Sequence, residues 1–357
     1  MGVYEGCVGP GIEGNERYAL WLHRTNVWGH DTLPFGPEST WDHVSGKWQD
    51  WFYEPWSKWI QAAPGRRLVL SVPLLPGPPD GSGPRTGDGG GKPVSLVQGA
   101  SGAYNEYFRE LARTLVAGQL GNSILRLGWE WNGNWYAWKV LNSEDAHHFA
   151  AYWRQIVNTM RSVPGTENLT FDWNVTSGFP MAFDPMEAYP GNAFVDYIGI
   201  DVYDQTWMSS AKFPKGVYPP PPGAGEQEIA ARHEAAWSQA IAAASAWGID
   251  YWQAFADRHG KPLTIPEWGL IQRPEPNNRG GSDNPYFIQR MFEYIQDPDH
   301  HVYFASYFDF DAQSEGNSRI SGVDSKPIAF PKSSQLYRAL FELPASSESQ
   351  APKKAED

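Results

Sequence analysis

Eight short apolar runs, most of them separated by segments with helical periodicity, are the feature that most restricts how this chain of 357 residues can fold. Such runs favour buried strands, and the amphipathic segments between them favour helices packed against the sheet. Eight strands alternating with helices predict an α/β fold, a single (β/α)8 TIM barrel. The predicted strands lie at residues 3–8, 26–30, 67–73, 124–130, 169–176, 196–203, 262–267 and 302–309.

The segments between these strands predict the helices. A Pro- and Gly-dense loop is expected at 74–92, and Ser143 is the expected N-cap of the helix after the fourth strand. A doubly wound open sheet is the alternative fold, but no G-x-G-x-x-G turn follows a predicted strand, which argues against dinucleotide binding. The predicted helices lie at residues 15–24, 41–62, 102–117, 143–162, 226–259 and 284–296.

Length favours one folded unit, because barrels of this size are commonly a single domain. We expect residues 1–343 to form the catalytic barrel. Residues 344–357 are rich in Ser, Ala, Lys and Glu and contain no aromatic residue, so we expect a disordered tail or a linker there.

The charge balance limits the partners. A net charge of −13 argues against a nucleic-acid or anionic-membrane surface, whereas a neutral polysaccharide remains compatible.

Cys7 is the only cysteine, which excludes an intrachain disulfide and a cysteine-based zinc site. We expect a monomer with no cofactor and no metal. The chain contains no signal peptide and no run of 18 apolar residues. Because the first predicted strand starts almost at once, we expect a secreted protein whose signal was removed upstream.

Residues 124–138 carry the strongest functional signal. An apolar strand there ends at Glu130, which is followed by a loop with several aromatic residues. Indole rings offer flat apolar faces to pyranose rings, and a carboxyl group can protonate a glycosidic oxygen. The alternative is a core strand that happens to end among tryptophans. The aromatic residues around this acid are Trp129, Trp131, Trp135, Tyr136 and Trp138.

Further acids stand at the carboxyl ends of predicted strands, where barrel enzymes place their chemistry. Glu267 closes the seventh strand beside Trp268, and Asp309 closes the eighth. Asp201 and Tyr203 share one face at the end of the sixth strand. Arg126 shares a face with Glu130, so we expect its guanidinium one layer below that carboxylate. Arg126 and Asp201 fit a structural ion pair as well as a substrate contact.

The runs R-L-G-W-E-W-N-G-N-W, D-Y-I-G-I-D-V-Y and P-E-W-G resemble glycoside hydrolase family 26, within the clan A glycoside hydrolases. That family contains β-mannanases, β-glucanases and β-1,3-xylanases. The resemblance implies that Glu130, with Arg126, Asn132 and Gly133, matches the family's R-x-x-H-E-x-N-G acid/base pattern. It also implies that Glu267 is the nucleophile and that Tyr203 hydrogen-bonds it. The predicted substrate-binding residues are Trp129, Asn132, Trp135, Trp138, Arg126, Tyr203, Asp201, Trp268 and Asp309.

Two departures from the family pattern concern the substrate. Trp129 replaces the histidine that usually precedes the acid/base, and the strand-eight tryptophan of the family has no counterpart, so that Phe308 or Tyr307 would have to serve. The two glutamates remain in place. The hypothesis is therefore a retaining, endo-acting β-glycoside hydrolase whose carboxyl groups lie roughly 5 to 5.5 Å apart. The second hypothesis, from another class, is a catalytically inactive barrel that binds glycans.

Overall fold

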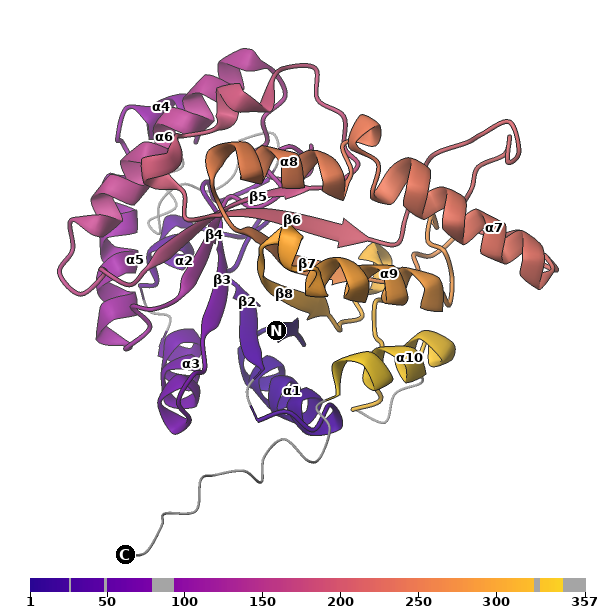
Figure 1. Cartoon of the computed structure of the whole chain (residues 1–357). Coiled ribbons are helices and arrows are strands. Elements are labelled where there is room, and N and C mark those ends of the chain that lie inside the picture. Colours follow the sequence, from indigo (N-terminus) through magenta and orange to yellow (C-terminus); the bar gives the residue numbers. More distant parts are fainter. Residues whose placement is uncertain (26, 48–49, 79–92, 324–327, 343–357) are drawn as a thin grey trace, which may run out of the picture.

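The computed structural model describes residues 1–25, 27–47, 50–78, 93–323 and 328–342. Within them, eight parallel strands form a closed barrel in sequence order, with β8 paired to β1. This confirms the predicted (β/α)8 barrel (Figure 1). The strands are β1 Gly2–Tyr4, β2 Trp28–Thr32, β3 Leu68–Val72, β4 Ile124–Leu127, β5 Thr170–Thr176, β6 Tyr197–Tyr203, β7 Leu263–Gly269 and β8 Val302–Phe308.

The helices lie outside the strands and cover the barrel wall (Figure 1). The predicted helix at 41–62 forms two helices, and two more, α4 and α10, lie outside the predicted ranges. The helices are α1 Val8–Trp21, α2 Trp41–Ser45, α3 Asp50–Ala62, α4 Leu96–Ala100, α5 Asn105–Ala117, α6 Ser143–Arg161, α7 Glu226–Ala236, α8 Ile249–His259, α9 Pro285–Gln296 and α10 Pro331–Phe341. Most of the predicted loop at 74–92, and all of the predicted tail at 344–357, lie outside the described residues.

The first strand is shorter than the sequence predicts because glycines turn the chain. β1 ends at Tyr4, and Gly6 follows with φ +107°. A Cβ on Gly11 would lie 2.1 Å from the carbonyl oxygen of Gly6, so the first turn of α1 can approach this turn only as glycine. Helix α6 begins at Ser143, as predicted, but its N-cap is Asn142 rather than Ser143, and the Asn142 side chain accepts from the backbone N–H of Asp145.

The Ala-rich segment predicted as one helix over 226–259 is interrupted. After α7 the chain forms a π-helical turn, Trp237–Ile241, and a 3₁₀ turn, Ala244–Ala246, before α8 begins. Trp247 is left-handed at φ +57°, and a Cβ on Gly248 would lie 2.5 Å from the carbonyl oxygen of Ile241. Gly248 was the visible signal for this break, because it allows a backbone approach that closes one helix and starts the next.

Large aromatic side chains fill the layer between the strands and the helices. Trp173 on β5, for example, stacks on Phe255 of α8 with ring centroids 5.4 Å apart. Many of the 18 tryptophans in the sequence therefore serve packing rather than sugar binding. Among the described residues, the fully buried tryptophans are Trp41, Trp56, Trp131, Trp138, Trp153, Trp173, Trp252 and Trp268.

The inside of the barrel is divided into an apolar floor and a polar upper part. Val69, Ile124, Tyr197 and Phe304 form a separate apolar cluster near the starts of their strands. On β4, Leu125 and Leu127 join the main core while Arg126 points inward, as the period of two requires. The polar upper part, in which every residue is buried, consists of His30, Ser71, Arg126, Asp172, Asn174, Asp201 and Thr264.

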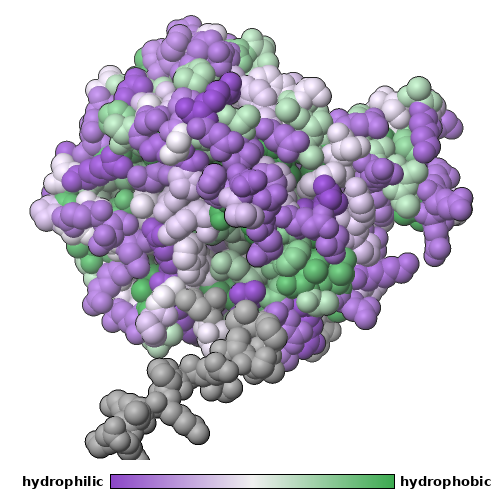
Figure 2. Space-filling model, viewed as in Figure 1, coloured by the Kyte–Doolittle hydropathy of each residue, from purple (hydrophilic) through white to green (hydrophobic). Residues whose placement is uncertain are grey.

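The surface in the view of Figure 1 is mostly hydrophilic, with smaller hydrophobic areas between the polar ones (Figure 2). In the described part of the chain, every helix is too short or too polar to cross a membrane.

Asp309 follows β8 and organises the loop beyond it. Its carboxylate is fully buried and accepts from the backbone N–H groups of Ile320, at 2.6 Å, and Ser321, at 3.1 Å, and from the hydroxyl of Ser321. This corrects its prediction as a substrate-binding residue, since both oxygens are used within the protein. We expect Asp309→Ala to lower the free energy of unfolding by about 3 kcal/mol, because it leaves buried donors unpaired. Urea denaturation measures this change. Asp311→Ala, at an exposed neighbouring position, should change it by less than about 0.5 kcal/mol.

Candidate active site

The acid predicted at the end of the fourth strand lies on a sharp turn. β4 stops at Leu127, and the chain then passes through Gly128 at φ +54° and Glu130 at φ +49°. A Cβ on Gly128 would lie 2.6 Å from the Leu74 side chain, so glycine is required there. The backbone N–H of Glu130 donates to the carbonyl oxygen of Asn174, at 3.1 Å, and to its side-chain oxygen, at 3.2 Å. These contacts with β5 hold a left-handed residue whose conformation costs about 1–3 kcal/mol.

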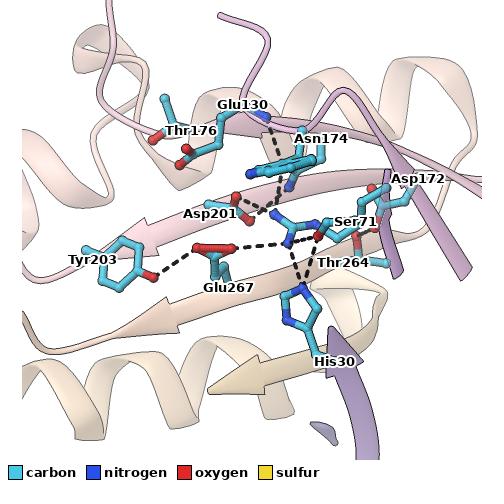
Figure 3. A network of polar contacts seen from close by, with 12 residues as sticks. His30, Ser71, Glu130, Asp172, Asn174, Thr176, Asp201, Tyr203, Thr264 and Glu267 are labelled. Carbon is cyan, nitrogen blue, oxygen red and sulfur yellow. Dashed lines mark hydrogen bonds and ion pairs between the residues drawn. The ribbon is translucent and has the colours of Figure 1, made fainter. Parts of the chain in front are cut away.

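The carboxyl group of Glu130 is half-buried and lies next to Thr176 (Figure 3). The indole Nε1–H of Trp135 donates to its Oε2 at 2.9 Å. Gly133 permits this contact, because a Cβ there would lie 2.4 Å from the Trp135 ring. Burial, followed by the negative charge of Glu267, raises the pKa of Glu130 to about 7, although Arg126, Trp135 and Thr176 act in the opposite direction. Near neutral pH this group can therefore carry a proton.

Glu267, on β7, lies between two donors (Figure 3). The hydroxyl of Tyr203 donates to its Oε1 at 3.1 Å, and Nη1 of Arg126 donates to its Oε2 at 3.1 Å. The contact with Tyr203 is the one that the family resemblance implies. The side chain is 15% exposed, so it can still reach a substrate. The two donors fix the orientation of the Glu267 carboxylate. One of them is the positively charged Arg126, whereas the neighbours of Glu130 are the neutral indole of Trp135 and the hydroxyl of Thr176.

Arg126 is the buried centre of the polar network. Its Nη2 donates to Asp201 at 2.5 Å and to Asn174 at 3.1 Å, and its Nη1 donates to Glu267. Burial lowers the pKa of Arg126, but the charges of Asp201 and Glu267 more than offset this effect and raise it overall. The inward guanidinium predicted from the sequence is thus present. Asp201 acts as its ion-pair partner, the structural alternative considered above, and the prediction that both bind substrate directly is corrected to a supporting position.

His30, Ser71 and Asn174 complete this network, and the sequence reasoning missed all three. Nη1 of Arg126 lies 2.9 Å from Nε2 of His30 and 2.9 Å from the hydroxyl of Ser71. Burial and the charge of Arg126 lower the pKa of His30 well below its usual value, so the ring is neutral and its Nε2 accepts a hydrogen bond from the guanidinium. Each residue sits on a strand of its own, at a position facing inward. The only sequence signal for these three residues was that each lies at an inward-facing position of the two-residue alternation along its strand.

Trp135 is a predicted substrate-binding residue whose ring is accessible in the structure. Its side chain is 39% exposed, and its ring meets Phe179 edge to face at 5.5 Å between centroids. The ring therefore offers surface beside the acid, where a sugar can lie while its glycosidic oxygen is protonated.

Four other predicted binding residues are corrected, because they lie in the core. Trp138 and Trp268 are each 1% exposed; the Nε1–H of Trp138 donates to a backbone carbonyl oxygen, and Trp268 packs against α9 and α10. Asn132 is also 1% exposed and exchanges two 2.9 Å hydrogen bonds with the backbone of Thr176. Trp129 is 3% exposed, and its Nε1–H donates to the Tyr136 hydroxyl. None of the four presents a free face to a sugar.

The two candidates on strand eight are separated by their exposure. Tyr307 is fully buried, and its hydroxyl accepts from the backbone N–H of Leu270. Phe308 is partly exposed, stacks on Tyr4 at 4.7 Å between ring centroids, and meets Tyr203 edge to face at 6.1 Å. Phe308 is therefore the aromatic side chain that β8 presents near Glu267.

The contact between Trp135 and Glu130 makes a pH prediction. The indole donor stabilises the carboxylate, so Trp135→Phe should raise the pKa of Glu130 further and keep the acid protonated to higher pH. We expect kcat/KM of the unchanged protein to fall as pH rises through about 7, and this fall to move to higher pH in the variant. A profile of kcat/KM against pH measures the shift. An unchanged or lower midpoint would contradict the assigned role of Glu130, whatever happens to the maximal rate.

Part of the chain matches a known protein family. Residues 107–218, which include Glu130 and Tyr203, match the family described as glycosyl hydrolase family 26. No curated protein matches the chain in sequence.

Similar solved structures share the fold. One is a modular endo-beta-1,4-mannanase from Cellulomonas fimi, with a TM-score of 0.55 and 19% identity over 96% of this chain and 68% of that chain. A second is GH26C from a Muricauda species, with a TM-score of 0.53 and 15% identity over 89% of this chain and 77% of that chain. A third is the catalytic domain of a Bacillus sp. GH26 endo-beta-1,4-mannanase, with a TM-score of 0.50 and 17% identity over 82% of this chain and 69% of that chain. The family match over residues 107–218 and the shared barrel make this chain similar to the O-glycoside hydrolases of glycosyl hydrolase family 26.

Proposed function

We propose that this protein is a retaining, endo-acting β-glycanase that cleaves a β-mannan, a β-glucan or a β-1,3-xylan with Glu130 and Glu267. The observation that carries the proposal is the contrast between the two carboxyl groups. Glu130 has its pKa raised to about 7, whereas Glu267 is held between Tyr203 and Arg126. Two acids with environments this different suit opposite roles in one reaction.

In the first step, a carboxylate oxygen of Glu267 attacks the anomeric carbon while Glu130 gives its proton to the leaving oxygen. The glycosidic bond breaks, and a glycosyl ester forms on Glu267. In the second step, Glu130 takes a proton from water, whose oxygen attacks the anomeric carbon and displaces Glu267. The two inversions retain the configuration. This sequence requires carboxyl groups about 5–5.5 Å apart, and a crystal structure with about 8 Å or more between them would contradict it.

Endo action is supported by the aromatic surfaces near both acids. Trp135 adjoins Glu130, and Phe308 adjoins Tyr203 and so lies near Glu267. A chain that lies across both acids has sugar units on either side of the bond to be cut. We also propose that the protein acts outside the cell, because a polymeric substrate has to be met there.

Release of reducing sugars from β-mannan, β-glucan and β-1,3-xylan tests the function, with the Glu267→Ala protein as the blank. β-1,4-mannan is tested first, since two of the similar structures are endo-beta-1,4-mannanases. We expect release from at least one polymer, together with a rapid fall in viscosity from internal cuts. Binding without release on every polymer would instead support an inactive glycan-binding barrel.

A further inference from the structure

A pocket of about 200 Å³ lies between the ends of β5 and β6 and the π-helical turn after α7. Thr176 and Tyr203 are among the residues that line it. These two residues also contact the catalytic pair, because Thr176 adjoins Glu130 and Tyr203 hydrogen-bonds Glu267. The pocket is therefore a side chamber of the active site rather than a separate surface feature.

The position of the pocket relates it to one side of the bond to be cut. Under the proposed mechanism Glu130 protonates the leaving oxygen, so the leaving sugar lies toward Glu130 and the end of β5. The pocket begins at Thr176, at the end of β5, and continues through Ser177 and Gly178. A group that enters the pocket would thus be attached to the leaving-group part of the substrate.

The lining has the character of a sugar site. Trp207 is 67% exposed and offers an indole face at the rim. Gln205 and Gln239 supply side-chain amides, and among the described residues the buried side-chain oxygen of Gln205 has no hydrogen-bond partner. An exposed indole and amides that can donate or accept suit the apolar face and the hydroxyl groups of a pyranose.

The electrostatics of the pocket favour a neutral ligand. Asp201 is the one charged residue among the described lining residues, and its carboxylate is paired with Arg126. A uronic acid or a sulfated sugar would meet no cation from this lining and would lie near an acid, which disfavours it. The volume suits one sugar ring rather than an extended chain.

We propose that this pocket binds a single neutral sugar that branches from the main chain on the leaving-group side, so that the enzyme prefers a branched polysaccharide. Trp207 stacks on the branch, and Gln205 and Gln239 contact its hydroxyl groups. This inference rests on the proposed function only for the orientation of the main chain.

The test is a binding measurement that needs no hydrolysis. Isothermal titration of the Glu267→Ala protein compares a linear oligosaccharide with the same oligosaccharide carrying one branch sugar. For a mannan main chain, the two probes are a β-1,4-manno-oligosaccharide and its singly galactosylated form. We expect the branched probe to bind about 10-fold more tightly, as one stacking and hydrogen-bonding subsite allows. Adding Trp207→Ala should remove this preference.

A matched control is Trp51→Ala, since Trp51 is also exposed, at 52%, but lies on α3 outside the pocket lining. It should leave the preference unchanged. Equal binding of both probes, or an equal loss of both in the Trp207→Ala protein, would overturn the branch subsite and make Trp207 a main-chain contact. Lack of hydrolysis by the unchanged protein would refute the proposed function separately, because the titration does not depend on turnover.

Discussion

Replacing Glu267 by alanine is expected to lower kcat by at least about 10⁴-fold on polysaccharides and on activated aryl glycosides alike. The variant lacks the oxygen that attacks the anomeric carbon. An activated leaving group does not compensate for the loss of this nucleophile. Steady-state rates on both substrate types measure the effect. Added azide can occupy the space left by the carboxylate and should give a glycosyl azide of the opposite anomeric configuration.

The matched control for this variant is Glu54→Ala, since Glu54 is an exposed residue of α3 that pairs with Lys58. It should keep the rate of the unchanged protein. We expect the Glu267→Ala protein to fold, because Arg126 retains its pairing with Asp201, and circular dichroism checks this. A folded Glu267→Ala protein that works within about 10-fold of the unchanged rate would remove Glu267 from the mechanism.

Replacing Glu130 by alanine should lower kcat on polysaccharides by about 10²–10⁴-fold, because the leaving oxygen then departs without a proton. Aryl glycosides with a good leaving group should still form the glycosyl-enzyme, which accumulates since no base activates water. A burst of the aryl alcohol followed by a slow steady rate is the expected trace. Azide should speed that slow phase and give a product of the same anomeric configuration as the substrate.

The two variants together decide the roles. If Glu130→Ala were dead on activated substrates and Glu267→Ala showed the burst, the assignment of acid and nucleophile would have to be reversed. The raised pKa of Glu130 and the pairing of Glu267 with Arg126 argue for the order given.

The sequence predicted the barrel because its evidence is repeated along the chain. Each buried strand adds an apolar run, and errors at the edges of single runs do not change their order. The ends of the individual strands and helices were harder to predict. The turn at Gly6 and the break at Gly248 depend on close backbone approaches to residues several positions away, which a local pattern does not reveal.

The carboxylate pair was predictable for a related reason. Strand ends in a barrel meet at one mouth, so Glu130 and Glu267 could be brought together without knowing the packing. Tyr203 and the inward Arg126 followed from the period of two along their strands.

The aromatic residues were predicted less well, because residue type does not say which face of the chain is covered. Trp135 and Trp138 lie three residues apart in one loop, yet Trp135 is 39% exposed and Trp138 is 1% exposed. Trp138 turns inward, where its Nε1–H donates to the carbonyl oxygen of Trp129. His30 and Asn174 were missed for the opposite reason, since a buried polar residue looks like an ordinary strand residue until its partners on other strands are known.

The most direct measurement of the central claim is mass spectrometric mapping of the trapped glycosyl-enzyme. Glu130→Ala protein is mixed with an activated aryl glycoside, quenched in acid during the burst, and digested. The account predicts one added sugar mass on the peptide that contains Glu267, and fragmentation should place it on that residue. A sugar on any other residue, or no labelled peptide while the burst is seen, would contradict double displacement through Glu267.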